Sequence, residues 1–308
     1  MQTRVQEKQS RSLPDILSYS HVLAALSRAM NKDSAKRIVD IVDTIQKEEE
    51  NGKNAMQIDN IGKCTQVCAL ATSYLCFEYR QTNILQVFET ALQGLSDPKY
   101  GDKELAHELL QRMFKLAKSG HNRVEPRSLC LNLVLKAQRS DLDVSTDRIV
   151  AFDVHRYLMD LVQSYDNGSI KVLPSQVGFN TVLNSWAGAR HWKAYRKAEE
   201  IYSTMERLSA SGAKNVSPDQ FTNALMLRIY ANSGKKKTAK RAIKFFNKLN
   251  NEDLDTFTYN CMLIMLSRSD IDGKVENARS ILKVMEKRGL ANIASYNTVV
   301  SYACRSII

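Results

Sequence analysis

A small residue followed by apolar residues three, four and seven positions later recurs along the chain. These offsets lie along one side of an α-helix, and the small residue allows a neighbouring backbone to approach closely. One copy predicts only an amphipathic helix, but several copies predict a repeated architecture. The copies begin at Ala35, Ala106, Ala198, Ala242 and Ala278, and a looser copy begins at Val154.

A second apolar run precedes each copy and carries a polar or small residue two positions before an apolar pair. Two antiparallel helices of this kind cannot bury their apolar faces alone and must stack on neighbouring pairs. The pattern therefore predicts an all-α fold, an α-solenoid of stacked helix-turn-helix repeats. The residues at the polar position are Ser20, Thr65, Asn132, Asn180, Asn260 and Asn297; near Gln220 the residue in register is Ala224, with Asn223 one position earlier, so that this register is ambiguous.

The expected repeats differ in length. We expect an N-terminal tail or partial cap at 1–15 and the repeat array over 16–308. A surface loop can lengthen at small entropic cost, so we place the extra residues in the polar stretches at 94–104, 140–147 and 190–195. The helical pattern is still present at residue 308, which leaves open whether the chain is truncated there. The expected units are 16–60, 61–127, 128–175, 176–219, 220–255 and 256–292, followed by a half-unit at 293–308.

Composition supports helices and suggests an anionic partner. Only 12 Gly and 5 Pro occur among 308 residues, which is little turn chemistry for a sheet protein. The formal net charge is +11, and residues 193–250 alone hold 13 basic and 4 acidic side chains. Such a surplus favours a polyanion as the partner. No run of 18 apolar residues occurs, so we expect no membrane association.

Signatures of catalysis and metal binding are missing from the sequence. The six cysteines lie scattered in apolar runs and predict buried thiols rather than a zinc site. His107 and Glu108 begin HELLQ, but Gln111 occupies the position where a zinc protease needs its second His. The deaminase pattern H-x-E with P-C-x-x-C and a glycine-rich phosphate loop are also absent. We therefore expect no enzyme, no catalytic residue, no metal and no cofactor.

The motifs of the last units resemble the pentatricopeptide repeat, a two-helix unit of about 35 residues. SYNTVV at 295–300, TYNCML at 258–263 and GFNTVLNSWA at 178–187 are similar to its beginning. AEEIYSTMERL and ARSILKVMEKRGL are similar to its second helix, and VLPS and VSPD to its linker. The resemblance covers nearly the whole chain and is strongest from residue 176. The tetratricopeptide repeat is the nearest alternative, but its Trp, Leu-Gly and Tyr pattern is absent.

The resemblance implies that the fifth and last residues of each unit contact one base of single-stranded RNA. An Asn amide offers both a donor and an acceptor for this purpose. Capping or solvation is the alternative for an Asn near a helix start, although capping would equally accept Ser, Asp or Thr. The implied pairs are Ser20 with Asn60, Asn132 with Ser175, Asn180 with Asp219, Asn223 or Ala224 with Asp255, and Asn260 with Asn292, while Asn297 begins a further pair and Thr65 with Arg127 fits no standard pair.

The resemblance also implies apolar contacts with the bases and basic contacts with the phosphates. Its second residue lies between adjacent bases, a position where Gly62 and Ala294 depart from the pattern. Phe221 and Phe257 could equally belong to the core. The basic run at 235–249 lies in a second helix, which the resemblance places on the convex side. The candidates for stacking are Leu17, Leu129, Val177, Phe221 and Phe257, and those for phosphate are Arg28, Arg268 and Arg305.

The function that the resemblance implies is sequence-selective binding of single-stranded RNA by a monomer. The implied target is close to A-n-C-U-n-Y, and the implied role is RNA processing, stability or translation in a mitochondrion or plastid. The N-terminal MQTRVQEKQSRS has no apolar segment of a secretory signal and supports a transit peptide only weakly. Two alternatives remain: a helical-repeat scaffold for protein partners, including partners within a ribonucleoprotein, and the RNA-binding half of a nuclease with a catalytic domain beyond residue 308.

Overall fold

The computed structural model describes residues 21–26, 36–44, 84–97, 101–120, 124–139, 147–189, 191–233, 236–249, 254–269 and 271–305. Within these ranges the regular elements are helices and no strand occurs, which confirms the all-α prediction. The chain divides into two compact units, Met1–Pro126 and Arg127–Ile308. The predicted site residues Leu17, Ser20, Arg28 and Asn60 lie outside the described residues, as do Gly62 and Thr65.

Unit 1 contains short helices at 21–26 and 36–44 and two longer ones, α3 (Ile84–Leu95) and α4 (Lys103–Lys118). Helix α4 begins after Asp102, whose side chain accepts hydrogen bonds from the backbone N–H groups of Glu104 and Leu105. Its small-and-apolar stripe, Ala106, Leu109, Leu110 and Met113, is buried. This outcome confirms the helical stripe that the sequence pattern predicts there.

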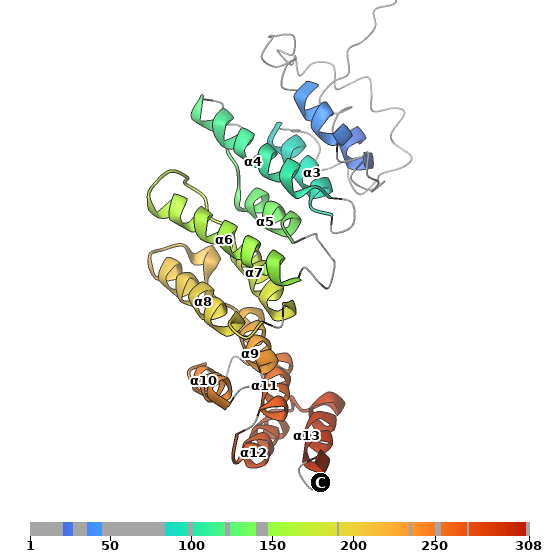
Figure 1. The fold of residues 1–308 in the computed structure, drawn as a ribbon, viewed down its shortest axis with the longest axis vertical. Helices are drawn as coiled ribbons and strands as arrows, with labels where there is room; N and C mark the ends of the chain where they lie inside the picture. Colours follow the sequence, from blue (N-terminus) through green and yellow to red (C-terminus); the bar gives the residue numbers. More distant parts are fainter. Residues whose placement is uncertain are drawn as a thin grey trace, which may run out of the picture. The chain divides into compact units, whose positions relative to one another are not determined.

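Unit 2 consists of stacked helix pairs (Figure 1). The first helices of the pairs pack successively on one another, so that α9 lies between α7 and α11. Each second helix packs against the first helices of its own pair and of the next pair. The first helices are α5 (Ser128–Ala137), α7 (Gln176–Gly188), α9 (Gln220–Ser233), α11 (Thr256–Arg268) and α13 (Ile293–Arg305), and the second helices are α6 (Asp147–Asp166), α8 (Ala194–Ala210), α10 (Lys236–Phe246) and α12 (Lys274–Lys287).

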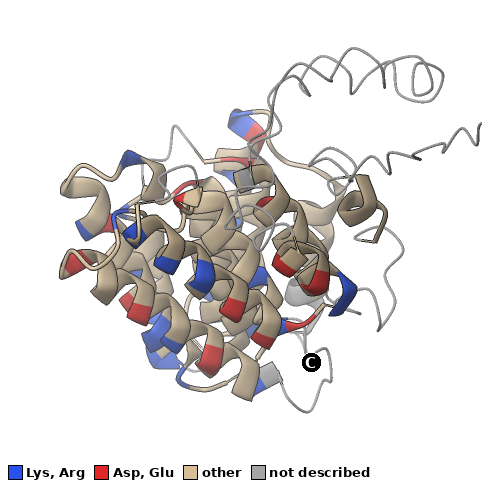
Figure 2. Cartoon of the chain, turned by 90° about the horizontal axis from the view of Figure 1, so that it is seen from above, with Lys and Arg blue, Asp and Glu red and all other residues tan. Residues whose placement is uncertain are grey.

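The two kinds of helix differ in how they are buried. First helices are covered by neighbours on several sides, so α9 buries residues as different as Thr222, Ala224 and Tyr230. Second helices bury one stripe, in which Ala198, Ala242 and Ala278 are at most 2 % exposed. Basic and acidic positions are both distributed along the described helices (Figure 2). The small residue of the sequence pattern is thus the point where a second helix meets its neighbours.

Ion pairs link successive second helices. The Arg207 guanidinium of α8 donates to both oxygens of Asp166, at 2.8 and 3.1 Å. The Arg241 guanidinium of α10 donates to Glu199 at 2.6 and 2.8 Å. Each pair is partly exposed and contributes on the order of 0.2–1 kcal/mol. The second layer is therefore stabilised chiefly by its buried stripe rather than by its surface charges.

None of the described helices is long and apolar enough to cross a bilayer. In the same described ranges, no group of three His, Cys, Asp or Glu is close enough to hold a metal ion. Cys130 and Cys261 are buried, and burial raises the pKa of the Cys261 thiol to about 11. Both cysteines thus have the environment that was predicted for core thiols.

Candidate nucleic-acid interface

The predicted base-contacting residues of unit 2 gather at the N-terminal turns of the first helices. From the expected unit 61–127 onward, the last residue of each expected unit directly precedes the next first helix, and we call it the capping residue of that helix. The fifth residue of a unit lies in the second turn of its own first helix. Successive first helices pack side by side, so the fifth residue of a unit lies near the last residue of the same unit, which caps the next first helix. We call each such contact a joint.

The joint between α7 and α9 contains Asn180, Asp219 and Thr222. Asn180 Nδ2 donates to Asp219 Oδ1 at 3.4 Å, and the Thr222 hydroxyl lies 2.8 Å from Asn180 Oδ1 and 2.6 Å from Asp219 Oδ1. The Asp219 carboxylate also accepts from the Thr222 backbone N–H at 2.7 Å, while the Asp219 N–H donates to the Thr222 hydroxyl at 3.2 Å. This reciprocal arrangement is a capping box with Thr at the third helical position. It brings together the predicted pair Asn180 and Asp219.

The joint between α11 and α13 has the same design with different side chains. Asn260 Nδ2 donates to Asn292 Oδ1 at 3.5 Å, and the Ser295 hydroxyl donates to Asn260 Oδ1 at 2.6 Å. Asn292 Oδ1 accepts from the Ser295 N–H at 3.0 Å, and the Asn292 N–H donates to the Ser295 hydroxyl at 3.2 Å. The predicted pair Asn260 and Asn292 is therefore also brought together.

The joint between α5 and α7 reaches a similar result without a hydroxyl at the third helical position. Asn132 Nδ2 donates to Ser175 Oγ at 2.7 Å, and the Ser175 backbone N–H donates to Asn132 Oδ1 at 3.1 Å. Gly178 occupies the third helical position, where an added Cβ would lie 2.5 Å from Asn132 Oδ1. The Asn132 amide thus fills the space that a hydroxyl side chain takes in the other two joints.

The joint between α9 and α11 differs because Ala224 holds the fifth position. Ala224 is buried, and Asn223 accepts a hydrogen bond from the Tyr202 hydroxyl at 3.1 Å. One residue along a helix rotates a side chain by about 100°, so Asn223 faces the second helix instead of Asp255. Asp255 caps α11 by accepting from the Thr258 N–H at 2.8 Å. Of the two alternatives for this position, the structure therefore places Ala224 in register and Asn223 against Tyr202.

The candidate stacking residues form an exposed apolar row beside these joints. Each occupies the second position of a first helix, and the exposed fractions are 48 % for Leu129, 64 % for Val177, 49 % for Phe221 and 51 % for Phe257. The alternative that Phe221 and Phe257 are core residues is therefore wrong. Ala294 is exposed at the equivalent position of α13. Each of these half-exposed apolar side chains is available to stack against a planar ligand.

The remaining predicted residues lie at other places on the first helices. Asn297 is exposed on α13, and Arg305 ends that helix, with its side chain outside the described part of the chain. Arg268 is exposed at the end of α11, where its guanidinium donates to Asn232 Oδ1 at 2.9 Å. Eight residues of helix separate Arg268 from Asn260, a distance of about 12 Å. Arg268 thus lies at the C-terminal end of α11, opposite the end that Asp255 caps.

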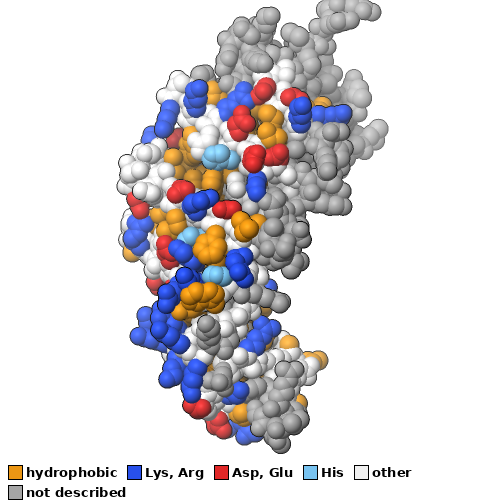
Figure 3. Space-filling model, viewed as in Figure 1, with side chains coloured by type: hydrophobic (Ala, Val, Ile, Leu, Met, Phe, Trp, Pro, Cys, Tyr) orange, Lys and Arg blue, Asp and Glu red, His pale blue; other side chains and the backbone are white. Residues whose placement is uncertain are grey.

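Basic side chains gather on the second helix α10. Lys237, Lys240 and Lys244 are exposed, and space-filling representation shows Lys and Arg clustered where α10 lies (Figure 3). The first turn of α10 contains no acidic residue, although the helix dipole would favour one there. Lys236 donates to Asp272 at 2.9 Å, and this contact together with nearby Lys240 holds the pKa of the Asp272 carboxyl below its usual value. The surface is strongly attractive to anions.

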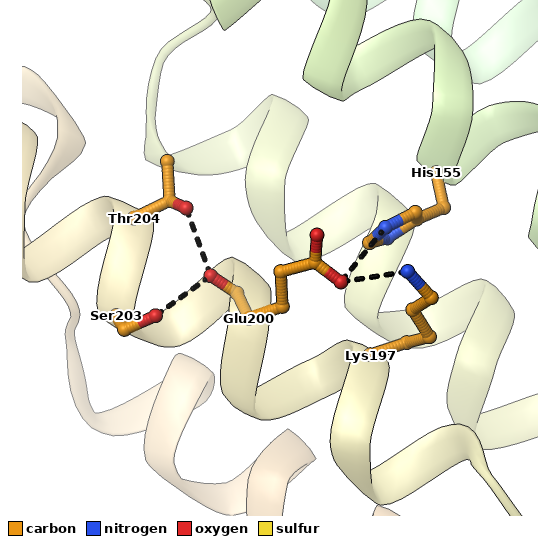
Figure 4. A network of polar contacts seen from close by, with 5 residues as sticks. All are labelled: His155, Lys197, Glu200, Ser203 and Thr204. Atoms are coloured by element: carbon orange, nitrogen blue, oxygen red, sulfur yellow. Dashed lines mark hydrogen bonds and ion pairs between the residues drawn. The ribbon is translucent and has the colours of Figure 1, made fainter.

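A buried histidine lies in the second layer, away from the joints. His155 of α6 is 5 % exposed, and its Nε2 lies 3.5 Å from Glu200 Oε2, which also accepts from Lys197 at 2.7 Å (Figure 4). Burial and the Lys197 charge lower the pKa of His155 to about 4, against the opposing effect of Glu200. The Ser203 and Thr204 hydroxyls donate to the Glu200 backbone oxygen instead of the imidazole. These contacts stabilise the packing of α6 on α8 and align no nucleophile with the histidine.

Comparisons with known proteins give a distant structural likeness. No family model matches the chain, and no curated protein sequence matches it. The solved structure of the pentatricopeptide repeat protein PPR10 from maize aligns with 94 % of this chain at 17 % sequence identity and a TM-score of 0.25. The alignment covers 47 % of that protein, so this chain spans about half its length. Membership of the pentatricopeptide repeat family stays a prediction from the sequence motifs.

Proposed function

We propose that this chain binds single-stranded RNA along the N-terminal turns of its first helices, with one base at each helix pair. The observation that carries the proposal is the coincidence, at successive first helices, of a half-exposed apolar residue with a neighbouring polar pair. In α7, for example, Val177 lies three residues before Asn180, which is bonded to Asp219. Bases need both a face to stack on and polar groups at their edges.

The polar pairs have the size and chemistry that a base edge requires. Asn, Asp and Ser are short side chains, and their mutual hydrogen bonds hold them on rigid helices rather than on loops. Asn180 is 7 % exposed and Asn132 and Asn260 are partly exposed, so a ligand would approach them through the open side of each joint. A surface used only for protein docking would not require a similar polar pair at three of four joints.

The charge of the chain supports a nucleic acid as the partner. The formal net charge is +11, and the exposed lysines of α10 add a strongly positive surface to unit 2. Such a surface raises the local concentration of a polyanion and speeds its association. We assign base selectivity to the joints and salt-dependent attraction to the basic surface.

The proposed preference follows the sequence resemblance. Asn132 with Ser175 is expected to favour cytosine, Asn180 with Asp219 uracil, and Asn260 with Asn292 a pyrimidine. The joint that contains Ala224 lacks an amide and is expected to accept any base. The proposed target in unit 2 is therefore C-U-n-Y. From the same resemblance we propose that the chain acts as a monomer in a mitochondrion or plastid, by binding RNA and not by catalysis.

The test is selection of bound RNA from a random single-stranded pool by the purified chain, followed by titration at several salt concentrations. Enrichment of C-U-n-Y that Asn180→Ala relaxes at one base, and that Asn277→Ala on exposed α12 leaves intact, is the expected result. Binding without enrichment, with a salt slope near 0.7 per phosphate contact, would refute base selectivity. Absence of binding at moderate salt would refute the RNA proposal and favour the protein scaffold.

A further inference from the structure

The amide orientation is the same in the three joints that contain an Asn at the fifth position. In each joint the amide oxygen lies within hydrogen-bond distance of a donor within the protein: the Ser175 backbone N–H, the Thr222 hydroxyl and the Ser295 hydroxyl. The two hydroxyls also face the capping side chains, Asp219 at 2.6 Å and Asn292 at 3.0 Å. In each joint the amide nitrogen donates to the capping side chain. Two different kinds of donor, a backbone N–H and a hydroxyl, thus produce one orientation.

Groups that can act only as donor or only as acceptor determine this orientation. The Ser175 N–H can only donate, so Asn132 must turn its oxygen toward it. The Asp219 carboxylate can only accept, so Asn180 must turn its nitrogen toward it. Asn292 must turn its oxygen toward the Ser295 N–H, and that oxygen then faces the Asn260 nitrogen. The reversed amide would place like groups together in every joint.

The fourth joint supplies an internal comparison. Its fifth residue is Ala224, so no amide is present for a hydroxyl to bind. The Thr258 hydroxyl, which is equivalent to those of Thr222 and Ser295, donates to the backbone oxygen of Gln220 at 3.5 Å instead. A hydroxyl at the third helical position therefore contacts the amide wherever the preceding unit provides one.

We propose that the hydroxyls of Thr222 and Ser295 engage the oxygens of the Asn180 and Asn260 amides, whose orientation the capping residues set, and so leave these amides as donors toward a ligand, which makes the two hydroxyl residues specificity-determining positioning residues. This inference rests on the proposed function, because it assumes that the amides contact bases. With its oxygen engaged inside the joint, each Asn has one N–H left for a ligand. The matching group on a base is an acceptor, such as pyrimidine O2, cytosine N3 or uracil O4. Thr222 and Ser295 are fully buried, so they reach a ligand only through the Asn amides and the capping residues Asp219 and Asn292 that their hydroxyls contact.

The test compares two variants that remove the same hydroxyl from equivalent positions. Ser295→Ala frees the Asn260 oxygen, so we expect the preference at the base beside Asn260 to fall roughly threefold to tenfold, the range that one net hydrogen bond supports. Overall affinity for a uniform pool should change less. Thr258→Ala removes an equivalent hydroxyl that contacts no Asn, so every base preference should persist. Ser295→Thr keeps the hydroxyl and should retain the preference.

A second measurement tests the amide without RNA. In protein labelled with ¹⁵N-asparagine, Ser295→Ala should shift the side-chain NH₂ resonances of Asn260 and accelerate their hydrogen exchange, while Thr258→Ala should leave them in place. Unchanged Asn260 resonances, or an equal loss of base preference in both variants, would overturn the inference. If the resonances shift but the unaltered protein selects no base, the proposed function fails and the amide contact stands. Thr222→Val, followed at Asn180, repeats the test if Ser295→Ala does not fold.

Discussion

Substitution of Gly178 by Ala tests the close approach between α5 and α7. The added Cβ would lie 2.5 Å from Asn132 Oδ1, 2.8 Å from Pro174 Cβ and 3.0 Å from Leu135 Cδ1. Overpacking of this kind costs about 1–3 kcal/mol, and displacement of the Asn132 amide would weaken its bonds to Ser175 by about 1 kcal/mol. The better helix propensity of Ala returns up to about 1 kcal/mol. We therefore expect the free energy of unfolding to fall by about 1–3 kcal/mol.

The matched control is Gly188→Ala at the other end of the same helix. No atom lies within 4 Å of a Cβ added at Gly188, so only the helix propensity changes and the variant should gain up to about 1 kcal/mol. Urea unfolding followed by far-ultraviolet circular dichroism measures both variants. Asn132→Ala in the Gly178→Ala background removes the shortest contact and should recover part of the loss, as a coupling of about 1 kcal/mol. Equal stability of the two glycine variants would refute the proposed packing at this joint.

Three further predictions concern acidity, stacking and capping. The pKa of His155 is lowered to about 4, so the unfolded chain binds this proton at a higher pH than the folded chain does, and stability is lost as pH falls from about 6.5 to 4. His155→Phe should lessen that loss by up to about 1.4 kcal/mol per pH unit in urea titrations. Equal pH dependence of the free energy of unfolding in the variant and the unaltered chain would contradict the assignment. Phe221→Ala and Phe257→Ala should each weaken RNA binding by about 1–3 kcal/mol in fluorescence anisotropy, whereas Val284→Ala, which removes an exposed apolar residue of α12, should not. Asp255→Ala should destabilise the chain by about 1 kcal/mol in urea, while Asp255→Asn, which keeps an acceptor, should retain most of the stability.

Helical periodicity located the helices because it is a local property of the sequence. The stripe that begins at Ala198 needs only residues within seven positions of one another, and the structure buries Ala198, Ile201 and Met205 together. The same reasoning could not decide whether Phe221 belongs to the core. Its exposure depends on how α9 is rotated between α7 and α11, which is a property of the packed helices.

The joints could be predicted only in part, because their partners come from different units. The hydroxyls in TYN at 258–260 and SYN at 295–297 are visible in the sequence, but Ser295 bonds to Asn260, 35 residues earlier. In the sequence Gly178 is only a residue of low helix propensity, and its close approach to Asn132 becomes apparent only in the structure. A glycine or hydroxyl residue lies three positions after Ser175, Asp219, Asp255 and Asn292, and this spacing is the signal that could have indicated these contacts.

Capping and base contact need not compete as explanations of the joints. The capping residues Asp219, Asp255 and Asn292 each accept from a backbone N–H, a role that selects Ser, Asp, Asn or Thr. Those same short side chains are the ones that the proposed function requires at a base edge. Asp219 already accepts from the Thr222 N–H with Oδ1, and its second carboxylate oxygen adds acceptor capacity for a ligand. At position 219, therefore, only substitutions by residues that still cap α9 are expected to change the base preference without lowering the free energy of unfolding.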